Sequence, residues 1–206
     1  MALWMVRSGR HGEGDEIALS RRVVGIGWSQ AGDLSDVTTT DELQERLIES
    51  YPDAKPSTIS NWVGQVDAFQ RRMADGDLVA LPLKTEPIVA IGRVAGPYGY
   101  VPDAPESLRH QRPVTWLREV PRDAIDQDIL YSLGAFLTVC RIQRNDAEAR
   151  VRQLLARPDG SPPLVPAPPT EELPAVDTDR QPDADLDRVL DRELPHYAEA
   201  LERLGQ

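Results

Sequence analysis

The stretch VVGIGWSQAGDLSD, from Val23 to Asp36, decides how this chain begins to fold. Its first residues are small and β-branched, which is typical of a strand, and its later residues form turns. The glycines on both sides of Ile26 indicate a backbone that another group approaches closely. Trp28 and Ser29 follow at the predicted end of the strand. Three interpretations are open: a dinucleotide fold, a nucleophile turn, or the wall of a binding pocket.

Residue spacing excludes the first two interpretations. A dinucleotide site requires G-x-G-x-x-G between a strand and a helix, but Gly25 and Gly27 are followed next by Gly32. A helix N-terminus for the pyrophosphate is also missing, because the next helix is predicted only from Thr39. A nucleophile elbow requires G-x-S-x-G, and one residue too many separates Ser29 from Gly32. The binding-pocket interpretation is retained.

The helices around this stretch have clear start signals. Thr39 and Glu42 match a capping box, and Pro56 suits the first turn of a second helix. Asn145 and Glu148 repeat the capping pattern for a final helix that runs to about residue 155. The second helix carries an apolar stripe at helical spacing, which consists of Ile59, Trp62, Val63, Val66, Phe69 and Met73.

Strand-like segments dominate the rest of the first 157 residues. They are predicted at residues 3–7, 23–28, 77–83, 87–96, 112–117 and 137–142. Strands and helices do not alternate regularly, so a doubly wound parallel sheet is not expected. The prediction is an α+β fold: a small, strongly bent β-barrel with flanking helices.

Composition divides the chain into three parts. Residues 1–157 hold 19 Lys+Arg against 22 Asp+Glu and are predicted to form one domain. Residues 158–182 are rich in proline and predict an acidic, extended linker. Residues 183–206 predict an amphipathic helix that begins a further module. The last 49 residues hold 4 Lys+Arg against 12 Asp+Glu, so most of the net charge of −11 lies there.

Few residues support catalysis or metal binding. The one cysteine, Cys140, and three scattered histidines (His11, His110 and His196) give no pair at ligand spacing. No metal, cofactor or catalytic residue is therefore predicted, and the chain is not expected to be an enzyme. It also lacks an apolar run long enough to span a membrane and a secretory signal, so we expect a soluble cytoplasmic protein.

Aromatic and arginine residues are the remaining candidates. Trp4 and Trp62 fit core positions, whereas Trp28 ends a strand beside polar residues. Tyr98 and Tyr100 lie in the Gly/Pro-rich loop GPYGYVP, where exposed aromatic rings can stack on a base. The candidates for contacts with phosphate are Arg93, Arg109, Arg112 and Arg118.

The order of these motifs resembles a known group of folds. IGWS at a strand end, two helices, GDLVALPL, IVAIGRVAGPYGY and RPVTWLREVPRDAI resemble the PUA-like superfamily, which includes EVE and YTH domains. Residues 1–157 are most similar to the N-terminal domain of Mrr-like, modification-dependent restriction endonucleases. The shared motifs include GDLS and YPDAKP followed by NWVGQ.

The resemblance implies an aromatic cage for a flipped, modified base. Trp28 would stack on the base, and Ser29 would hydrogen-bond its edge, as in the similar Trp-Ser pair of YTH domains. By position, Asp33 and Asn61 would add polar contacts. Trp116 resembles a tryptophan on a strand of those domains. Cleavage in the similar proteins belongs to a nuclease module, so this chain is expected to act with an attached or partner nuclease in phage defence.

Three functions follow as hypotheses. The first is a sensor that binds modified bases in DNA rather than RNA. The second is a small-ligand or nucleotide-signal receptor that regulates an attached effector from the same pocket. The third is an interaction scaffold in which the C-terminal helix makes a homodimer contact. A basic rim favours the first hypothesis, because duplex binding needs phosphate contacts, whereas a closed, neutral rim favours the second.

Overall fold

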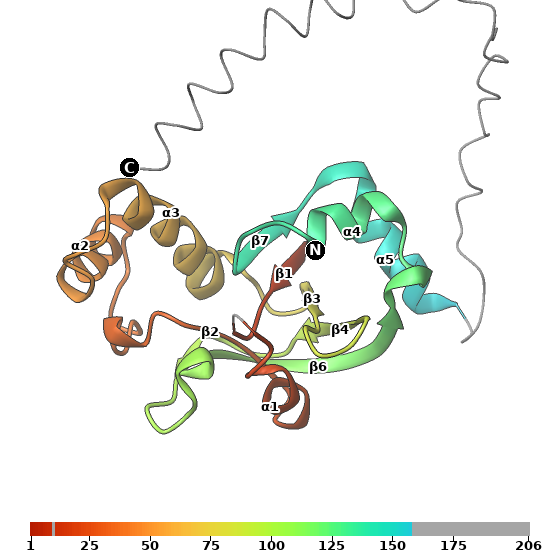
Figure 1. Cartoon of the computed structure of the whole chain (residues 1–206), viewed down its shortest axis with the longest axis horizontal. Helices are drawn as coiled ribbons and strands as arrows, with labels where there is room; N and C mark the ends of the chain where they lie inside the picture. Colours follow the sequence, from red (N-terminus) through yellow and green to blue (C-terminus); the bar gives the residue numbers. More distant parts are fainter. Residues whose placement is uncertain (10, 158–206) are drawn as a thin grey trace, which may run out of the picture. The chain divides into compact units, whose positions relative to one another are not determined.

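A computed structural model describes residues 1–9 and 11–157 (Figure 1). The predicted linker (158–182) and terminal helix (183–206) lie outside these residues. The described elements, in chain order, are β1 (Leu3–Val6), α1 (Asp15–Ser20), β2 (Val23–Ile26), α2 (Thr40–Ser50), α3 (Pro56–Asp67), β3 (Leu78–Pro82), β4 (Ile88–Val94), β5 (Gly99–Tyr100), β6 (His110–Pro121), α4 (Gln127–Leu133), β7 (Val139–Ile142) and α5 (Ala147–Ala156). The protein is a mixed α+β fold with a curled half-barrel sheet, which confirms the expected class.

The sheet is mostly antiparallel, and its longest strand, β6, pairs with three others. Its order is β2-β6-β4-β3-β1-β7, with β5 paired to β6. The pairing of β1 with β3 is parallel, and the other pairings are antiparallel. The start of β6 pairs with β2 and β5 and its end pairs with β4, across a register shift at Gly92. This shift is a β-bulge, which bends a strand and increases its twist.

Helices cover both faces of the central strands. Trp4 and Val6 of β1 pack with α2 and α3, whereas Leu3 and Met5 pack with α4 and α5 (Figure 1). All four residues of β1 are consequently buried. A third cluster places α1 against Leu81 and Leu108. Trp4 is a core residue, as predicted, and its indole N–H donates to the buried Asp77 carboxylate (2.9 Å).

Local signals predicted two helix starts correctly. The capping box is present at α2, where the Thr39 side chain accepts from the Glu42 N–H and the Glu42 carboxylate accepts from the Thr39 N–H. Pro56 opens α3, which continues through a wider helical turn, Ala68–Arg72. The apolar stripe is buried there except for Trp62, which is half-buried.

Two local predictions fail. Helix α1 was not expected, because it has only six residues and no side-chain cap. The capping box predicted at Asn145 is wrong: α5 begins at Ala147, and the N-cap, Asp146, makes no side-chain cap. The Asn145 amide instead donates to Asp128 (2.6 Å), next to Arg150, which pairs with the same carboxylate. A tertiary contact between α4 and α5 thus replaces the local cap.

Candidate functional site

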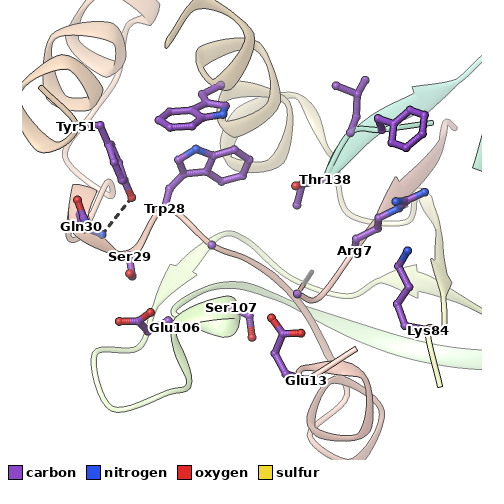
Figure 2. Close-up of a pocket in the computed structure, with 15 residues that line it drawn as sticks. Arg7, Glu13, Trp28, Ser29, Gln30, Tyr51, Lys84, Glu106, Ser107 and Thr138 are labelled. Atoms are coloured by element: carbon purple, nitrogen blue, oxygen red, sulfur yellow. Dashed lines mark hydrogen bonds between the residues drawn. The ribbon is translucent and has the colours of Figure 1, made fainter. Parts of the chain in front are cut away.

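A cleft of about 600 Å³ opens where β2 ends. Figure 2 shows Trp28 and Tyr51 on one side of it and Arg7 and Lys84 on the other. Its lining comes from segments far apart in the chain: Arg7, Gly9, Glu13, Gly27, Trp28, Ser29, Gln30, Tyr51, Trp62, Lys84, Glu106, Ser107, Phe136, Leu137 and Thr138. The pocket predicted beside Trp28 therefore exists as a concave surface.

The two glycines of the opening stretch have different roles. A Cβ atom on Gly25 would lie 2.6 Å from Leu108 Cδ2 and 2.8 Å from Leu108 Cα, so this position accepts only glycine without rearrangement. The expected close approach is thus made by the protein itself. Gly27 has no atom within 4 Å of such a Cβ and lines the cleft.

Trp28 has an unusual backbone. Its φ of 64° and ψ of 33° place it in the left-handed region, where a bulky residue costs about 1–2 kcal/mol. It caps a short 3₁₀ turn, Ser29–Ala31, and its half-buried indole lines the cleft. Strained residues of this kind persist only where the surrounding structure holds them, and they concentrate at functional sites.

A buried hydrogen-bond relay holds Trp28. The His110 Nε2 atom lies 3.1 Å from the Trp28 carbonyl oxygen, and Nδ1 lies 2.7 Å from the Tyr98 hydroxyl. The hydroxyl also accepts from the Leu34 N–H (3.3 Å). Because a carbonyl only accepts, the His110 proton is on Nε2. Burial lowers the pKa of His110, which favours the neutral ring, so Nδ1 accepts the Tyr98 proton.

Trp62 and Tyr51 complete the aromatic wall. The Trp28 and Trp62 rings meet edge to face with centroids 6.1 Å apart, and Tyr51 meets Trp62 in the same way at 5.1 Å. The Tyr51 hydroxyl accepts from the Gln30 N–H (3.3 Å), which ties α2 to the turn after Trp28. Burial raises the pKa of Tyr51. We define Trp28, Trp62 and Tyr51 as the aromatic wall.

The opposite side of the cleft is charged. Arg7, which follows β1, and Lys84, which follows β3, line it together with two exposed carboxylates, Glu13 and Glu106. Figure 2 shows Glu13 and Glu106 along one edge. The rim is therefore mixed in charge rather than uniformly basic.

One family model matches this chain over residues 4–134. That family is described as a domain of unknown function (DUF8426). The chain belongs to the DUF8426 family. The DUF8426 match runs from β1 to the end of α4 and includes the aromatic wall, Arg7 and Lys84. A search of curated proteins finds no match to the chain.

Two predicted cage residues of the DUF8426 domain support the site without lining it. Tyr98 belongs to the relay, and its ring stacks on His110 with centroids 6.0 Å apart. Tyr100 approaches the same imidazole at 5.1 Å. Burial raises the pKa of Tyr98, so its hydroxyl keeps its proton. Both tyrosines contact the imidazole that holds the Trp28 carbonyl, and neither is among the residues that line the cleft.

Three further predicted contacts are not part of the cleft. Asp33 is exposed and accepts from the N–H and hydroxyl of Ser35, and these hydrogen bonds lower its pKa. Asn61 is exposed and accepts from the Gln65 amide within α3 (2.6 Å). Trp116 packs between two core clusters and donates to the Ala18 carbonyl (3.2 Å). The structure therefore does not bring these three predicted residues to the cleft that Trp28 lines.

Arg112 is not available for phosphate. It is 4% exposed, and its guanidinium donates to the carbonyls of Phe69, Met73 and Gly96 and pairs with Asp75 (3.3 Å). The carbonyls of Phe69 and Met73 lie at the C-terminal end of the helical turn that continues α3, and Arg112 satisfies them there. The structure therefore places Arg112 in the interior, where its guanidinium is occupied by protein acceptors, and not in the cleft.

The other three arginines are bound to carbonyl oxygens outside the cleft. Arg93 donates to Gly76 (2.7 Å), and Arg109 donates to Ala104 (3.3 Å). Arg118 donates to Leu154 and Arg157, at the C-terminal end of α5. None of the three lines the cleft. The structure thus brings only Trp28 and Ser29 of the predicted site residues to it.

Sequence reasoning missed several residues of the cleft. Trp62 was assigned to the core because it shares the helical spacing of buried neighbours. Arg7 and Lys84 were not chosen as site residues, since Arg7 ends one predicted strand and Lys84 is a single cation that follows another. Within residues 1–9 and 11–157, no cluster of three or more His, Cys, Asp or Glu could hold a metal ion. In the same residues, no helix is long and apolar enough to cross a membrane.

Proposed function

We propose that this chain is a nucleic-acid-binding sensor module that holds a modified DNA base, flipped out of the duplex, against Trp28. The observation that carries the proposal is the left-handed Trp28, whose carbonyl is held by a fully buried histidine and whose indole lines a cleft of about 600 Å³. The indole packs on the core cluster with one part of its surface and lines the cleft with another, so a ligand in the cleft would meet a held aromatic side chain.

The energetics are consistent with base readout. Stacking a base on an aromatic side chain contributes about 1–3 kcal/mol. Extruding the base costs a few kcal/mol, and less where pairing is weak. A pocket that accommodates one added methyl group discriminates by about 1–3 kcal/mol. Trp28 is already ordered in the folded protein, so binding a base does not have to restrict this side chain further, and the affinity is higher for that reason.

Ser29 supplies a polar group next to the stacking surface. It lines the cleft, is half-buried, and its hydroxyl forms no hydrogen bond with the described part of the chain. A base presents donors and acceptors at its edge, so this hydroxyl provides the hydrogen bond that the resemblance assigned to it. Trp62 and Tyr51 add further aromatic lining on the side of Trp28.

The proposal includes a PUA-like fold and coupling to a nuclease module. The curled sheet with flanking helices is compatible with that fold, and the motif order over residues 1–157 resembles the N-terminal domain of Mrr-like restriction enzymes. In this proposal the domain recognises the modification, and cleavage belongs to the attached or partner module.

A mixed rim also supports a second candidate, a receptor for a small ligand or nucleotide signal. Arg7 and Lys84 are balanced by Glu13 and Glu106 around the cleft. Its volume lies within the range of about 300–1,000 Å³ typical of small-molecule sites. A free nucleotide would use the same aromatic wall, so the two candidates differ in whether a duplex is needed.

The test is a binding titration of the intact chain against matched duplexes. The duplexes carry cytosine, 5-methylcytosine, 5-hydroxymethylcytosine, adenine or N6-methyladenine at one position, and the affinity is measured at two salt concentrations. We expect one modified duplex to bind about 10-fold more tightly than its unmodified match. The corresponding free nucleosides and nucleotides, titrated in parallel, test the receptor candidate.

Two variants make the titration specific. Trp28→Ala should abolish the preference, whereas Trp116→Phe, which alters a tryptophan outside the cleft, should keep it. Equal, weak binding of all duplexes by the unmodified protein would refute base readout. Tight binding of a free nucleotide without duplex binding would favour the receptor.

A further inference from the structure

A second cleft adjoins the first and is lined by cations. Its volume is about 340 Å³, and its lining consists of Arg7, Pro82, Lys84, Val89, Arg122, Leu130, Leu133, Gly134 and Phe136. Three residues, Arg7, Lys84 and Phe136, line both clefts. The two clefts are therefore neighbours that share part of their lining.

The charge of the second cleft differs from that of the first. Three of its lining residues are cationic and none is acidic, whereas the first cleft has two of each sign. Arg7, Lys84 and Arg122 form no ion pair with the described residues. Buried Asp15 accepts from the backbone N–H of Lys84 (2.7 Å), and no ion pair joins Asp15 to the Lys84 ammonium group.

Backbone carbonyls position the two guanidinium groups. Arg7 Nη2 donates to the Leu133 carbonyl (3.0 Å), and Arg122 Nη2 donates to the Leu83 carbonyl (2.6 Å). Each of these hydrogen bonds uses one guanidinium nitrogen, so the outer end of each group keeps further N–H donors for a ligand. Among the described residues, the buried Arg7 Nε atom has no hydrogen-bond partner. The N–H groups available to a ligand in the cleft are therefore those at the outer end of the guanidinium group.

Repulsion between these cations is an unfavourable term that an anion would remove. Burial lowers the pKa of Arg7, and the nearby Arg122 lowers it as well, against an opposing effect of Cys140. Residues 1–157 hold 19 Lys+Arg against 22 Asp+Glu, so a cleft lined by three cations and no carboxylate differs from the average composition of this part of the chain. Concave sites lined by one sign of charge focus the field on a ligand of the opposite sign.

We propose that the second cleft binds a phosphate of the nucleotide whose base occupies the first cleft. The inference rests on the proposed function, and it specifies how the nucleotide is oriented in the site. The base lies against the aromatic wall, and the phosphate lies among Arg7, Lys84 and Arg122. Phe136, whose side chain is fully exposed and lines both clefts, lies between the base and the phosphate in this arrangement.

A first experiment tests the anion site without any base. The thermal midpoint of the intact chain is measured in sodium pyrophosphate and in sodium chloride of equal ionic strength. At about five times its dissociation constant, pyrophosphate should raise the midpoint by about 2–4 °C. Lys84→Ala and Arg122→Gln should each lose most of the rise.

The chain offers a matched control, because Lys55 is its only other lysine. It is exposed, precedes α3 and lines neither cleft, so Lys55→Ala should keep the full rise. A midpoint that does not respond to pyrophosphate, or an equal response in Lys84→Ala and Lys55→Ala, would overturn the anion site.

A second experiment connects the phosphate to the base. Affinity for the matched duplexes is measured from 50 to 200 mM salt. Lys84→Ala should weaken modified and unmodified duplexes by the same factor and reduce the slope of log K against log salt by about 0.9. Lys55→Ala should leave the slope unchanged.

The two proposals fail in different ways. If the preference for a modified base is absent but Lys84→Ala still reduces the salt slope, base readout is refuted and the phosphate site stands. If the preference is present but Lys84→Ala behaves like Lys55→Ala, the phosphate site is refuted and base readout stands.

Discussion

His110 and Arg112 lie two residues apart on β6, and both are buried, but they hold different parts of the molecule. Side chains at this spacing on a strand point to the same face. Arg112 donates to carbonyls that end a helix and a loop inside the fold, including Met73 (2.6 Å) and Gly96 (3.0 Å). His110 donates to the carbonyl of Trp28, whose indole lines the cleft.

Burial and hydrogen-bonding chemistry are alike at the two residues, so neither property separates a role in stability from a role in function. Both side chains satisfy backbone carbonyls. What differs is whether the carbonyl belongs to a residue that faces a ligand-sized space. On this view, removing Arg112 should affect mainly folding, whereas removing His110 should affect both folding and ligand binding.

The largest effect is expected from Arg112→Met. The variant keeps the apolar stem but leaves several buried carbonyls without a donor, and each such group costs about 1–3 kcal/mol. We expect a loss of about 3 kcal/mol in the free energy of unfolding, measured by urea denaturation.

Arg93→Met is the control, because Arg93 donates to one carbonyl and is half-buried. Its loss should stay below about 1 kcal/mol. Equal losses in the two variants would show that Arg112 does not close the helix end as described.

An intermediate effect is expected from His110→Phe, which leaves the Trp28 carbonyl without its donor and the Tyr98 hydroxyl without its acceptor. The variant should lose about 2 kcal/mol of stability and also the base preference. Because burial lowers the pKa of His110 in the folded state, its stabilising contribution is complete above the unfolded value of about 6.5. It decreases as the pH falls below that value.

The difference in unfolding free energy between the wild type and His110→Phe should therefore shrink from pH 7.5 to pH 5. Denaturation curves at four pH values measure it. A difference that grows toward low pH would mean that the folded state prefers the charged ring, contrary to the relay.

The smallest effect compares two replacements of Trp28. Glycine adopts a positive φ without the penalty of a side chain, whereas alanine keeps the penalty. Trp28→Gly should therefore be more stable than Trp28→Ala by about 1 kcal/mol, the reverse of the order in a helix or strand. Thermal unfolding of both variants checks this order, and a more stable alanine variant would contradict the left-handed backbone.

The sequence predicted those features that depend on neighbouring residues. The α2 capping box and the proline start of α3 are set within four residues of each helix end, and both are present. The alternation and β-branching of the strands gave the α+β class. Trp28 and Ser29 were placed correctly at the cleft because a strand end next to turn residues is itself a local signal.

Features that depend on distant contacts were not predictable in the same way. The role of Arg112 requires knowing that residues 69–73 end a helix beside β6. Likewise, His110 acts on Trp28 across 82 positions of the chain. Trp62 shares the spacing of core residues, and only the placement of α3 beside the end of β2 turns its ring to the cleft.

The most direct test of the central claim is the ratio of dissociation constants for modified and unmodified duplexes, measured for the wild type and for Trp28→Gly. We expect a ratio of about 10 or more for the wild type. For Trp28→Gly we expect a ratio near one, with a folded domain shown by its unfolding curve. A wild type that binds both duplexes equally, or a Trp28→Gly variant that keeps the preference, would refute base readout by Trp28.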